Sequence, residues 1–205
     1  MACYIFGAGD LSALRDRPQT GDYVIAADGG WNACLALGIT PSLLLGDFDS
    51  LGAVPEFGSV ERVPVEKDDT DMMLAVKRGL ALGHREFHLY GGMGGKRTDH
   101  TMANFQTLLY LARRDAQGWL YGEREVFTAI HNGSMTFPAR ERGILSVFCL
   151  GADAEGVSIW GAQYEVENAA LTADFPLGVS NHFVGKEITV SVERGSLLLG
   201  LCREE

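Results

Sequence analysis

Residues 43–52 read LLLGDFDSLG, and the character of the sequence changes halfway along this stretch. Leu43, Leu44 and Leu45 form a continuous apolar run, which indicates the end of a buried strand. Asp47 and Asp49 then follow, two positions apart. Two carboxylates this close repel each other, so their place at the end of a hydrophobic strand requires a physical reason.

The segments on either side of this stretch alternate between two patterns. Short apolar runs that lead into loops predict strands, and apolar residues at helical spacing predict helices. The predicted strands cover residues 3–10, 23–30, 42–50 and 86–95, and the predicted helices cover residues 31–38, 67–83 and 101–115. Strands that alternate with helices indicate parallel strands joined by crossovers, so we predict an α/β fold for this half.

The pattern changes after about Gly118. Short strands separated by Gly, Asn and Pro turns are predicted at residues 125–137, 143–151, 156–166 and 186–201. Val190 and Val192 alternate with polar residues, as in a half-exposed strand. We therefore predict two domains, residues 1–118 and 119–205, the second an antiparallel sandwich or barrel. The second is small for a complete core, so it is expected to pack on the first, on a second subunit, or on both.

Composition limits the partners of the chain. Its 205 residues include 17 basic and 27 acidic residues, which give a formal charge of -10. This charge disfavours nucleic acid and anionic membranes as partners, and a phosphate ligand would need local Lys, Arg or a metal ion.

The four cysteines, at positions 3, 34, 149 and 202, show no Cys-x-x-Cys spacing. This spacing favours free thiols, as in a reducing compartment. The first residues show neither a basic leader nor an apolar run long enough for a signal peptide, so we predict a cytoplasmic protein.

Polar residues collect where the predicted strands of the first half end. In an open parallel sheet, ligands bind beyond the carboxyl ends of the strands. The residues that follow these strands, or that open the helix at residue 67, are Gly7-Ala8-Gly9-Asp10, Asp28-Gly29-Gly30, Asp47, Asp49, Asp68, Asp69, Asp71, and the loop of residues 91–99 with Lys96, Arg97 and Asp99.

Several of these features also have a structural interpretation. An Asp-Gly-Gly sequence is ordinary turn chemistry. Asp68 and Asp71 at a helix start can satisfy free amide groups and complement the helix dipole. The glycine-rich loop is not a Walker loop, because Arg97 rather than Ser or Thr follows Lys96. His100 is interpreted as a residue of the first helical turn, and Trp31 as a packing residue.

The stretch at residues 46–50 favours a functional interpretation. In an extended chain, Asp47 and Asp49 point the same way and Phe48 points away. Both carboxylates can stay ionised at low cost when a cation lies between them, and hard oxygen ligands suit Mg²⁺. Asp71 is a candidate third ligand. Together with the glycine-rich loop and its Lys and Arg, this set suggests a nucleoside triphosphate site.

At this point the sequence resembles a known family, the thiamine pyrophosphokinases. The resemblance rests on the order and spacing of four motifs between residues 26 and 108. These are Asp28-Gly29-Gly30, Gly46-Asp47-Phe48-Asp49-Ser50, Lys67-Asp68-x-Thr70-Asp71, and Gly94-Gly95-Lys96-Arg97-x-Asp99-His100 with Asn104 and Leu108 after it. The second half is similar more faintly, through residues 160–171, 178–183 and 193–201.

The resemblance implies a nucleotide-binding α/β domain with a parallel sheet, followed by an antiparallel β-sandwich. It implies a homodimer that transfers a diphosphoryl group from ATP to the hydroxyl of thiamine, with the site shared between subunits. The metal ligands would be Asp47, Asp49 and Asp71, which with Arg97 form the catalytic set. The ATP site would include Asp28, Gly29, Gly30, Lys67, Gly94, Gly95, Lys96, Arg97 and Asp99, and thiamine would be bound by Asp68, Ser180 and Asn181.

One departure from the family pattern leaves the identity of the phosphate-binding residue undecided between two positions. The glycine-rich loop is one residue longer than the family's form, so Lys96 and Arg97 are both candidates for the role of the family's phosphate-binding arginine.

Two other functions are compatible with the sequence. One is a diphosphokinase for another alcohol, such as a hydroxymethylpterin, and the other is a nucleotide- or thiamine-binding regulator without turnover. Three converging carboxylates speak against the regulator, because a pure binder has little need for them.

Overall fold

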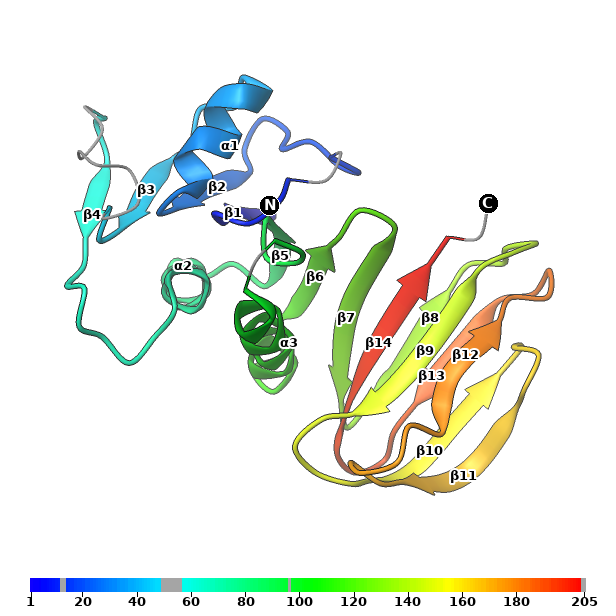
Figure 1. The fold of residues 1–205 in the computed structure, drawn as a ribbon. Coiled ribbons are helices and arrows are strands. Elements are labelled where there is room, and N and C mark those ends of the chain that lie inside the picture. Colours follow the sequence, from blue (N-terminus) through cyan, green and yellow to red (C-terminus); the bar gives the residue numbers. More distant parts are fainter. Residues whose placement is uncertain (12–13, 49–56, 96, 204–205) are drawn as a thin grey trace. The chain divides into compact units, whose positions relative to one another are not determined.

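The structure is a computed structural model that describes residues 1–11, 14–48, 57–95 and 97–203 (Figure 1). The chain divides into two compact units. Unit 1 comprises Met1–Thr107 and Ala116–Glu123, and unit 2 comprises Leu108–Asp115 and Arg124–Glu205. The predicted division into functional domains at residue 118 stays a prediction. In the described ranges, no helix combines the length and the apolar character that crossing a bilayer requires.

Unit 1 is built on a parallel sheet. Its strands are β1 (Cys3–Phe6), β2 (Tyr23–Ala27), β3 (Leu43–Gly46), β4 (Val60–Arg62), β5 (Glu86–Tyr90) and β6 (Gln117–Tyr121). Its helices are α1 (Gly30–Leu37), α2 (Asp71–Ala81) and the first part of α3 (Thr98–Ala112). The strands lie in the order β6-β5-β1-β2-β3-β4, and each neighbouring pair is parallel. The predicted α/β fold of this half is confirmed.

The central strands of unit 1 are buried because helices cover them. Every residue of β1 and β3 is buried, which explains their continuous apolar sequences. Helix α1 contacts β1 and β2, and α2 contacts β1, β2 and β3. The packing is close enough to require glycine, since a Cβ atom at Gly30 would lie 1.8 Å from the Phe6 carbonyl oxygen. Gly30 therefore has a packing role at the start of α1.

The strand order places a topological switch point between β1 and β5. The chain proceeds from β1 outward to β2 and β3, and later returns to add β5 on the other side of β1. The loops that follow β1 and β5 are in direct backbone contact, because Gly9 N donates a hydrogen bond to Gly91 O at 2.9 Å. Open α/β sheets bind their ligands at such a point, beyond the carboxyl ends of the strands.

Unit 2 consists mainly of two antiparallel sheets, drawn as two layers in Figure 1. Its strands are β7 (Glu125–His131), β8 (Ser134–Phe137), β9 (Ile144–Cys149), β10 (Ala154–Trp160), β11 (Val166–Leu171), β12 (Gly178–His182), β13 (Ile188–Ser191) and β14 (Ser196–Cys202). One sheet has the order β12-β9-β14-β7 and the other β11-β10-β13-β8. Val147 and Leu199 of the first sheet and Val157 and Val190 of the second are buried core residues. The predicted antiparallel β-sandwich is confirmed.

Some elements differ from the sequence-based predictions. Residues 156–166, predicted as one strand, form the end of β10 and the turn into β11, because Gly161 has a φ of 82° and reverses the chain. Strand β6 extends the parallel sheet past residue 118, where the pattern was expected to change, and Gly118 itself pairs with Phe87 of β5. Strands β4 and β12 were not predicted, since their short sequences are polar and largely exposed.

Candidate active site

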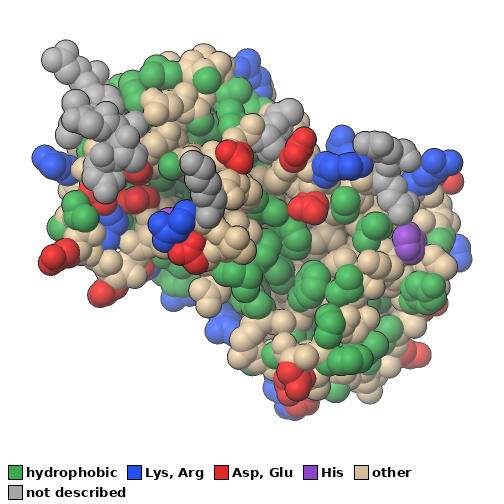
Figure 2. Space-filling view, in the orientation of Figure 1, with side chains coloured by type: hydrophobic (Ala, Val, Ile, Leu, Met, Phe, Trp, Pro, Cys, Tyr) green, Lys and Arg blue, Asp and Glu red, His purple; other side chains and the backbone are tan. Residues whose placement is uncertain are grey.

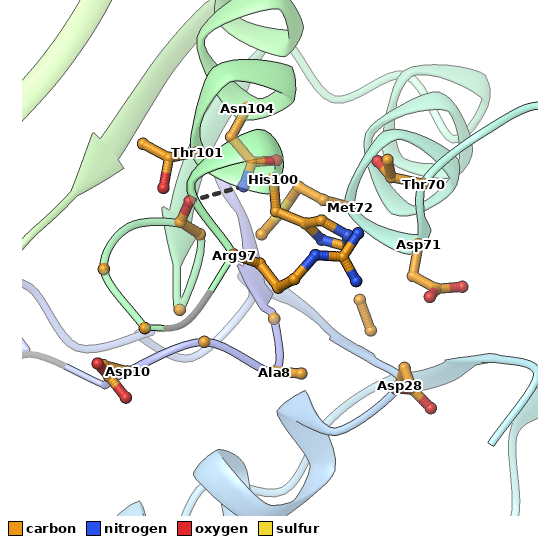
Figure 3. Close-up of a pocket in the computed structure, with 17 residues that line it drawn as sticks. Ala8, Asp10, Asp28, Thr70, Asp71, Met72, Arg97, His100, Thr101 and Asn104 are labelled. Carbon is orange, nitrogen blue, oxygen red and sulfur yellow. Dashed lines mark hydrogen bonds between the residues drawn. The ribbon is translucent and has the colours of Figure 1, made fainter. Parts of the chain in front are cut away.

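A cavity of about 420 Å³ lies at the switch point of unit 1 (Figure 3). The loops after β1, β2 and β5 and the first turns of α2 and α3 form its walls. It is lined by Gly7, Ala8, Gly9, Asp10, Ala27, Asp28, Thr70, Asp71, Met72, Gly91, Gly92, Gly94, Gly95, Arg97, His100, Thr101 and Asn104. Asp28, Asp71, Gly94, Gly95 and Arg97 were predicted site residues, and the fold brings these five to one cavity.

At Asp71 the cavity adjoins a cluster in which two carboxylates share one cation, and the other two members of this cluster, Asp47 and Lys67, do not line the cavity. Lys67 Nζ lies 2.6 Å from Asp47 Oδ2 and 3.1 Å from Asp71 Oδ1. Asp71 is the first residue of α2, but it is not the helix cap, because the Thr70 side chain accepts the hydrogen bond from Met73 N. Thr70 rather than Asp71 therefore caps the helix, while Asp71 lies in the first helical turn, where its charge complements the helix dipole as the structural interpretation expected. Its carboxylate is available to the cavity.

The electrostatics of this cluster follow from burial and from the shared ammonium. Burial alone would lower the pKa of Lys67, but hydrogen bonds to Asp47 and Asp71 outweigh it and raise the pKa. Burial raises the pKa of Asp71, which Lys67 partly offsets and which the charges of Asp47 and Asp28 reinforce. Asp71 Oδ1 is a buried atom, and its distance of 3.1 Å to Lys67 Nζ is longer than that of Asp47 Oδ2. A single ammonium therefore serves both carboxylates.

The chain turns sharply where β2 and β3 end. Asp28 is buried, with a relative exposure of 8%, and its φ is 47°. Phe48 has a φ of 63°, so the chain is not extended at this residue. From the sequence we assumed an extended chain over residues 47–49, and this assumption is wrong. Phe48 is itself buried. Such left-handed conformations are costly for non-glycine residues and cluster at functional sites.

Asp49 lies outside the described residues, and so does Lys96. In the described ranges, no group of three or more His, Cys, Asp or Glu side chains has the arrangement of a metal site. The described part of the acidic cluster thus contains Asp47 and Asp71 with Lys67. The predicted role of Asp49 as a metal ligand stays a prediction.

The glycine-rich loop faces the acidic side across the cavity. Gly94 and Gly95 both have a φ of 74°, a conformation that favours glycine. The Asn104 side chain, buried in α3, donates a hydrogen bond to Gly92 O at 2.7 Å and so anchors the loop (Figure 3). Figure 3 shows the Arg97 side chain between Asp10 on one side and Asp71 on the other. The loop thus supplies both backbone turns and a guanidinium to the cavity.

Arg97 is held by its neighbour two positions along the chain. Its Nε and Nη2 atoms donate hydrogen bonds to the Asp99 carboxylate at 2.9 and 2.7 Å. This pairing lowers the pKa of Asp99 to about 2. Both side chains are more than 60% exposed, so the pair adds little to stability. Asp99 instead orients the guanidinium at the entrance of α3.

Other predicted residues lie apart from the cavity wall. Gly29 precedes α1, and Gly30 packs on Phe6, and neither lines the cavity. Asp68 is exposed. The ring centroid of Trp31 lies 5.4 Å from that of Phe57, so this side chain packs as predicted. His100 occupies the first turn of α3, as predicted, and it also lines the cavity.

In unit 2, Ser180 and Asn181 have different surroundings. Ser180 is exposed on β12 and has a φ of 59°. Asn181 is buried, and its Oδ1 accepts hydrogen bonds from the backbone N atoms of Tyr164 and His182, both at 2.9 Å. Its Nδ2 donates to Tyr164 O at 2.7 Å. The Asn181 amide thus bonds to the backbone of its own unit on three of its four positions.

Sequence reasoning missed part of the cavity wall. Asp10, Met72 and Thr101 line the cavity and were assigned no role. Asp10 was visible as an acidic residue at a strand end, and Met72 was interpreted only through its helical spacing. Asn104 was noted as part of the fourth motif without a function. Its hydrogen bond to Gly92 depends on a tertiary contact that the sequence does not reveal.

Comparisons with known proteins agree with this architecture. The family model described as "Thiamin pyrophosphokinase, catalytic domain" matches residues 15–120, and the model described as "Thiamin pyrophosphokinase, vitamin B1 binding domain" matches residues 134–197. The thiamine pyrophosphokinase of Bacillus subtilis (strain 168) is 25% identical over 182 residues, which cover 85% of each chain.

Solved structures share the fold along the whole chain. The crystal structure of thiamine pyrophosphokinase from Bacillus subtilis has a TM-score of 0.89 at 23% identity and covers 100% of both chains. That of thiamin pyrophosphokinase from Geobacillus thermodenitrificans has a TM-score of 0.84 at 24% identity, with coverage of 100% of this chain and 99% of that one. Because the catalytic-domain model alone matches more than half of the residues, the chain belongs to the thiamin pyrophosphokinase family of enzymes.

Proposed function

We propose that this chain transfers a diphosphoryl group from ATP to the hydroxyethyl oxygen of thiamine, giving thiamine diphosphate and AMP. The observation that carries the proposal is the cavity at the switch point, with Asp28 and Asp71 on one side and the glycine-rich loop with Arg97 on the other. Family membership supplies the substrate pair. The cavity has the chemical features that a triphosphate with a metal ion requires.

The ATP site in this proposal extends along the loops of unit 1. The backbone of Gly94 and Gly95 approaches the phosphates, and Arg97 binds phosphate oxygens with two parallel hydrogen bonds. Asp28 borders the nucleotide. The same site includes Gly29, Gly30, Lys67, Lys96 and Asp99.

The described residues fit a divalent metal ion. Asp47 and Asp71 already contact one cation, the Lys67 ammonium, so their oxygens are oriented toward a shared positive charge. Carboxylate oxygens of this kind are ligands for Mg²⁺, and we propose that Asp47, Asp49 and Asp71 hold it. When bound, Mg²⁺ would neutralise charge that develops on the phosphoryl oxygens.

The protein's own part in the reaction is to position the substrates and to stabilise charge. The thiamine oxygen forms a bond to the β-phosphorus of ATP while the bond from that phosphorus to the bridging α-phosphate oxygen breaks, and AMP leaves with this oxygen. Arg97 offsets negative charge on the phosphoryl group. An aspartate of the acidic cluster accepts the hydroxyl proton. The acidic surroundings also favour the cationic thiazolium ring of thiamine.

Thiamine binding is assigned to Asp68, Ser180 and Asn181. Ser180 is exposed and held at a positive φ, a conformation that is maintained only where the surrounding structure enforces it. Asn181 contributes by holding the Tyr164 backbone next to it. We propose that the chain is a homodimer in which unit 1 of one subunit and unit 2 of the other form each site.

Surface composition supports a second subunit. Large hydrophobic side chains are exposed on unit 2, where Phe175 is 64% and Leu177 is 59% exposed. In Figure 2, hydrophobic side chains gather over the region labelled β9 to β14 in Figure 1. Exposed apolar patches of this kind mark interaction surfaces.

The four cysteines are free, which suits a reducing compartment, and we place the reaction in the cytoplasm.

Phosphorus NMR tests the reaction directly. The chain is incubated with ATP, Mg²⁺ and thiamine, and the products are identified by their chemical shifts. AMP together with thiamine diphosphate is the expected outcome. ADP would indicate ordinary phosphoryl transfer, and unchanged ATP would contradict the proposed acceptor. A parallel reaction with a hydroxymethylpterin as acceptor serves as the specificity control.

Subunit mixing tests the shared site. Asp49→Asn is expected to inactivate unit 1, and Ser180→Trp to inactivate unit 2. If units from different subunits meet, a mixed dimer contains one intact site of two. Random re-pairing makes about half the dimers mixed, so about a quarter of wild-type activity should return. An inactive mixture after verified subunit exchange would place each site within one chain.

A further inference from the structure

The Lys67 ammonium lies between two carboxylates, in the position that a shared cation would occupy. Its Nζ atom is 2.6 Å from Asp47 Oδ2 and 3.1 Å from Asp71 Oδ1, so a single positive charge contacts both acidic residues. These two residues come from different elements, since Asp47 follows β3 and Asp71 opens α2. The ammonium therefore holds the end of a strand and the start of a helix together.

Burial limits what can replace this ammonium. The side chain of Lys67 is 14% exposed, that of Asp47 is 10% exposed and that of Asp71 is 28% exposed. Two largely buried carboxylates without a cation would be strongly unfavourable. A divalent ion between the same oxygens would repel the ammonium at a distance of a few ångströms. The ammonium and such an ion cannot both keep these contacts.

We propose that Lys67 is an internal counter-ion that takes the place of the metal ion in the metal-free protein and leaves the two carboxylates when the metal ion binds. This inference rests on the proposed metal site. The flexible side chain of lysine allows the ammonium to move, and the phosphates of the nucleotide offer it a new anionic partner. Metal ion and nucleotide then bind with positive coupling, because each favours the displaced position of Lys67.

The chain contains a matched control in Lys77. Lys77 Nζ also lies 2.6 Å from a carboxylate oxygen, that of Asp69. This pair involves one carboxylate, and its side chains are 42% and 28% exposed. Neither lysine lines the cavity, but Lys67 contacts Asp71, which does, whereas Lys77 contacts Asp69, which does not. If removal of any lysine charge near α2 changed the affinity for Mn²⁺, the change would appear in variants of both lysines. The proposed mechanism predicts a change in variants of Lys67 alone.

The first test measures Mn²⁺ binding without nucleotide, using the electron paramagnetic resonance signal of free Mn²⁺. Lys67→Met and Lys67→Gln are both expected to bind Mn²⁺ about tenfold or more tightly than the wild-type chain, because the competing charge is gone. Lys67→Arg keeps the charge and is expected to bind weakly, as the wild type does. Lys77→Met should match the wild type.

The second test uses the wild-type chain and does not depend on the folding of a variant. Acetic anhydride labels lysine amines, and peptide mass spectrometry gives the rate at each position. Mn²⁺ at a concentration that saturates the site is expected to speed labelling of Lys67 but not of Lys77. A non-transferable ATP analogue with a methylene group between the α- and β-phosphates should then protect Lys67.

Two results would overturn the inference. One is Mn²⁺ affinity of folded Lys67→Met and Lys67→Gln no higher than that of the wild type. The other is a labelling rate of Lys67 that saturating Mn²⁺ leaves unchanged. A different result would refute the metal site itself, namely that neither the wild type nor the Lys67 variants bind Mn²⁺ at all in the nucleotide-free measurement. The two failures are therefore distinguishable.

Discussion

The acidic cluster of unit 1 and Asn181 of unit 2 use polar side chains in opposite ways. Asp47 and Asp71 are directed at a cation, Lys67, and the helix that Asp71 opens is capped by another residue, Thr70. Asn181 is bonded to the backbone of Tyr164 and His182. Replacing a carboxylate of the first set leaves the cap of α2 in place, whereas replacing Asn181 removes hydrogen bonds to the backbone. Polar residues of the family motifs can thus serve chemistry or serve the fold.

The sharpest test of this contrast is Asp71→Asn. The change removes one charge with almost no change in shape, and the Thr70 cap still starts α2. We expect turnover to fall about a hundredfold or more, the scale of losing one key electrostatic group, with the unfolding transition preserved. Steady-state kinetics and circular dichroism provide the measurement. Near-wild-type turnover at limiting Mg²⁺ would remove Asp71 from the metal site. Asp49→Asn, outside the described residues, is expected to behave similarly.

Asn181→Ala should show the reverse pattern. It leaves backbone groups of Tyr164 and His182 without their partners, so we expect the free energy of unfolding to drop by about 1–3 kcal/mol. Urea unfolding measures this change. The matched control is Ser180→Ala, an exposed position where stability should change by less than about 0.5 kcal/mol. If both variants are equally stable, Asn181 does not organise the backbone and the contrast is lost.

Arg97→Ala extends the comparison to the loop. Because we propose that the Arg97 guanidinium binds phosphate oxygens bidentately, its loss should lower kcat/KM for ATP about tenfold or more, and by more than Lys96→Ala does. Kinetics at varied ATP, with thiamine saturating, give the values. A much larger effect of Lys96→Ala would mean that the longer loop has shifted the phosphate-binding role by one residue.

The smallest effect concerns Asp99. Pairing with Arg97 lowers the pKa of Asp99 to about 2, and in Arg97→Ala the pKa should return toward the ordinary aspartate value of 3.8. Because the folded-state pKa is the lower one, the stabilisation from this pair is present above about pH 4 and is lost as the pH falls toward 2. Carboxyl carbon NMR titration measures both values. An unchanged Asp99 pKa in the variant would show that the pair does not form in solution.

Much of the fold was predictable because hydrophobic patterns decide it. The apolar runs at Cys3–Phe6, Tyr23–Ala27 and Leu43–Gly46 are fully or almost fully buried strands, and their sequences show it. Val60–Arg62 and Gly178–His182 pair as strands through their backbones, with polar, partly exposed side chains. Pairing of that kind depends on neighbouring strands, and a local pattern does not reveal it.

The candidate site was predictable where residue type alone restricts the chemistry. Carboxylates and glycines at strand ends indicated the cavity, and the fold brings Asp28, Asp71 and Gly94 to it. The bridging position of Lys67 was not predictable, because it depends on distances between loops that only the tertiary structure sets. The left-handed conformation of Phe48 was missed for a related reason, since bulky residues avoid it without tertiary constraint.

The contact between the loops after β1 and β5 has a consequence for engineering substrate preference. A Cβ atom at Gly9 would lie 2.5 Å from Gly91 O, and one at Gly91 would lie 2.4 Å from Gly7 O. A side chain added at either position would force the two loops apart, and shrinking the opposite residue could not compensate, because it is already glycine. Libraries that aim to change the accepted nucleotide should therefore keep these glycines fixed and vary Ala8, whose φ is not in the left-handed range.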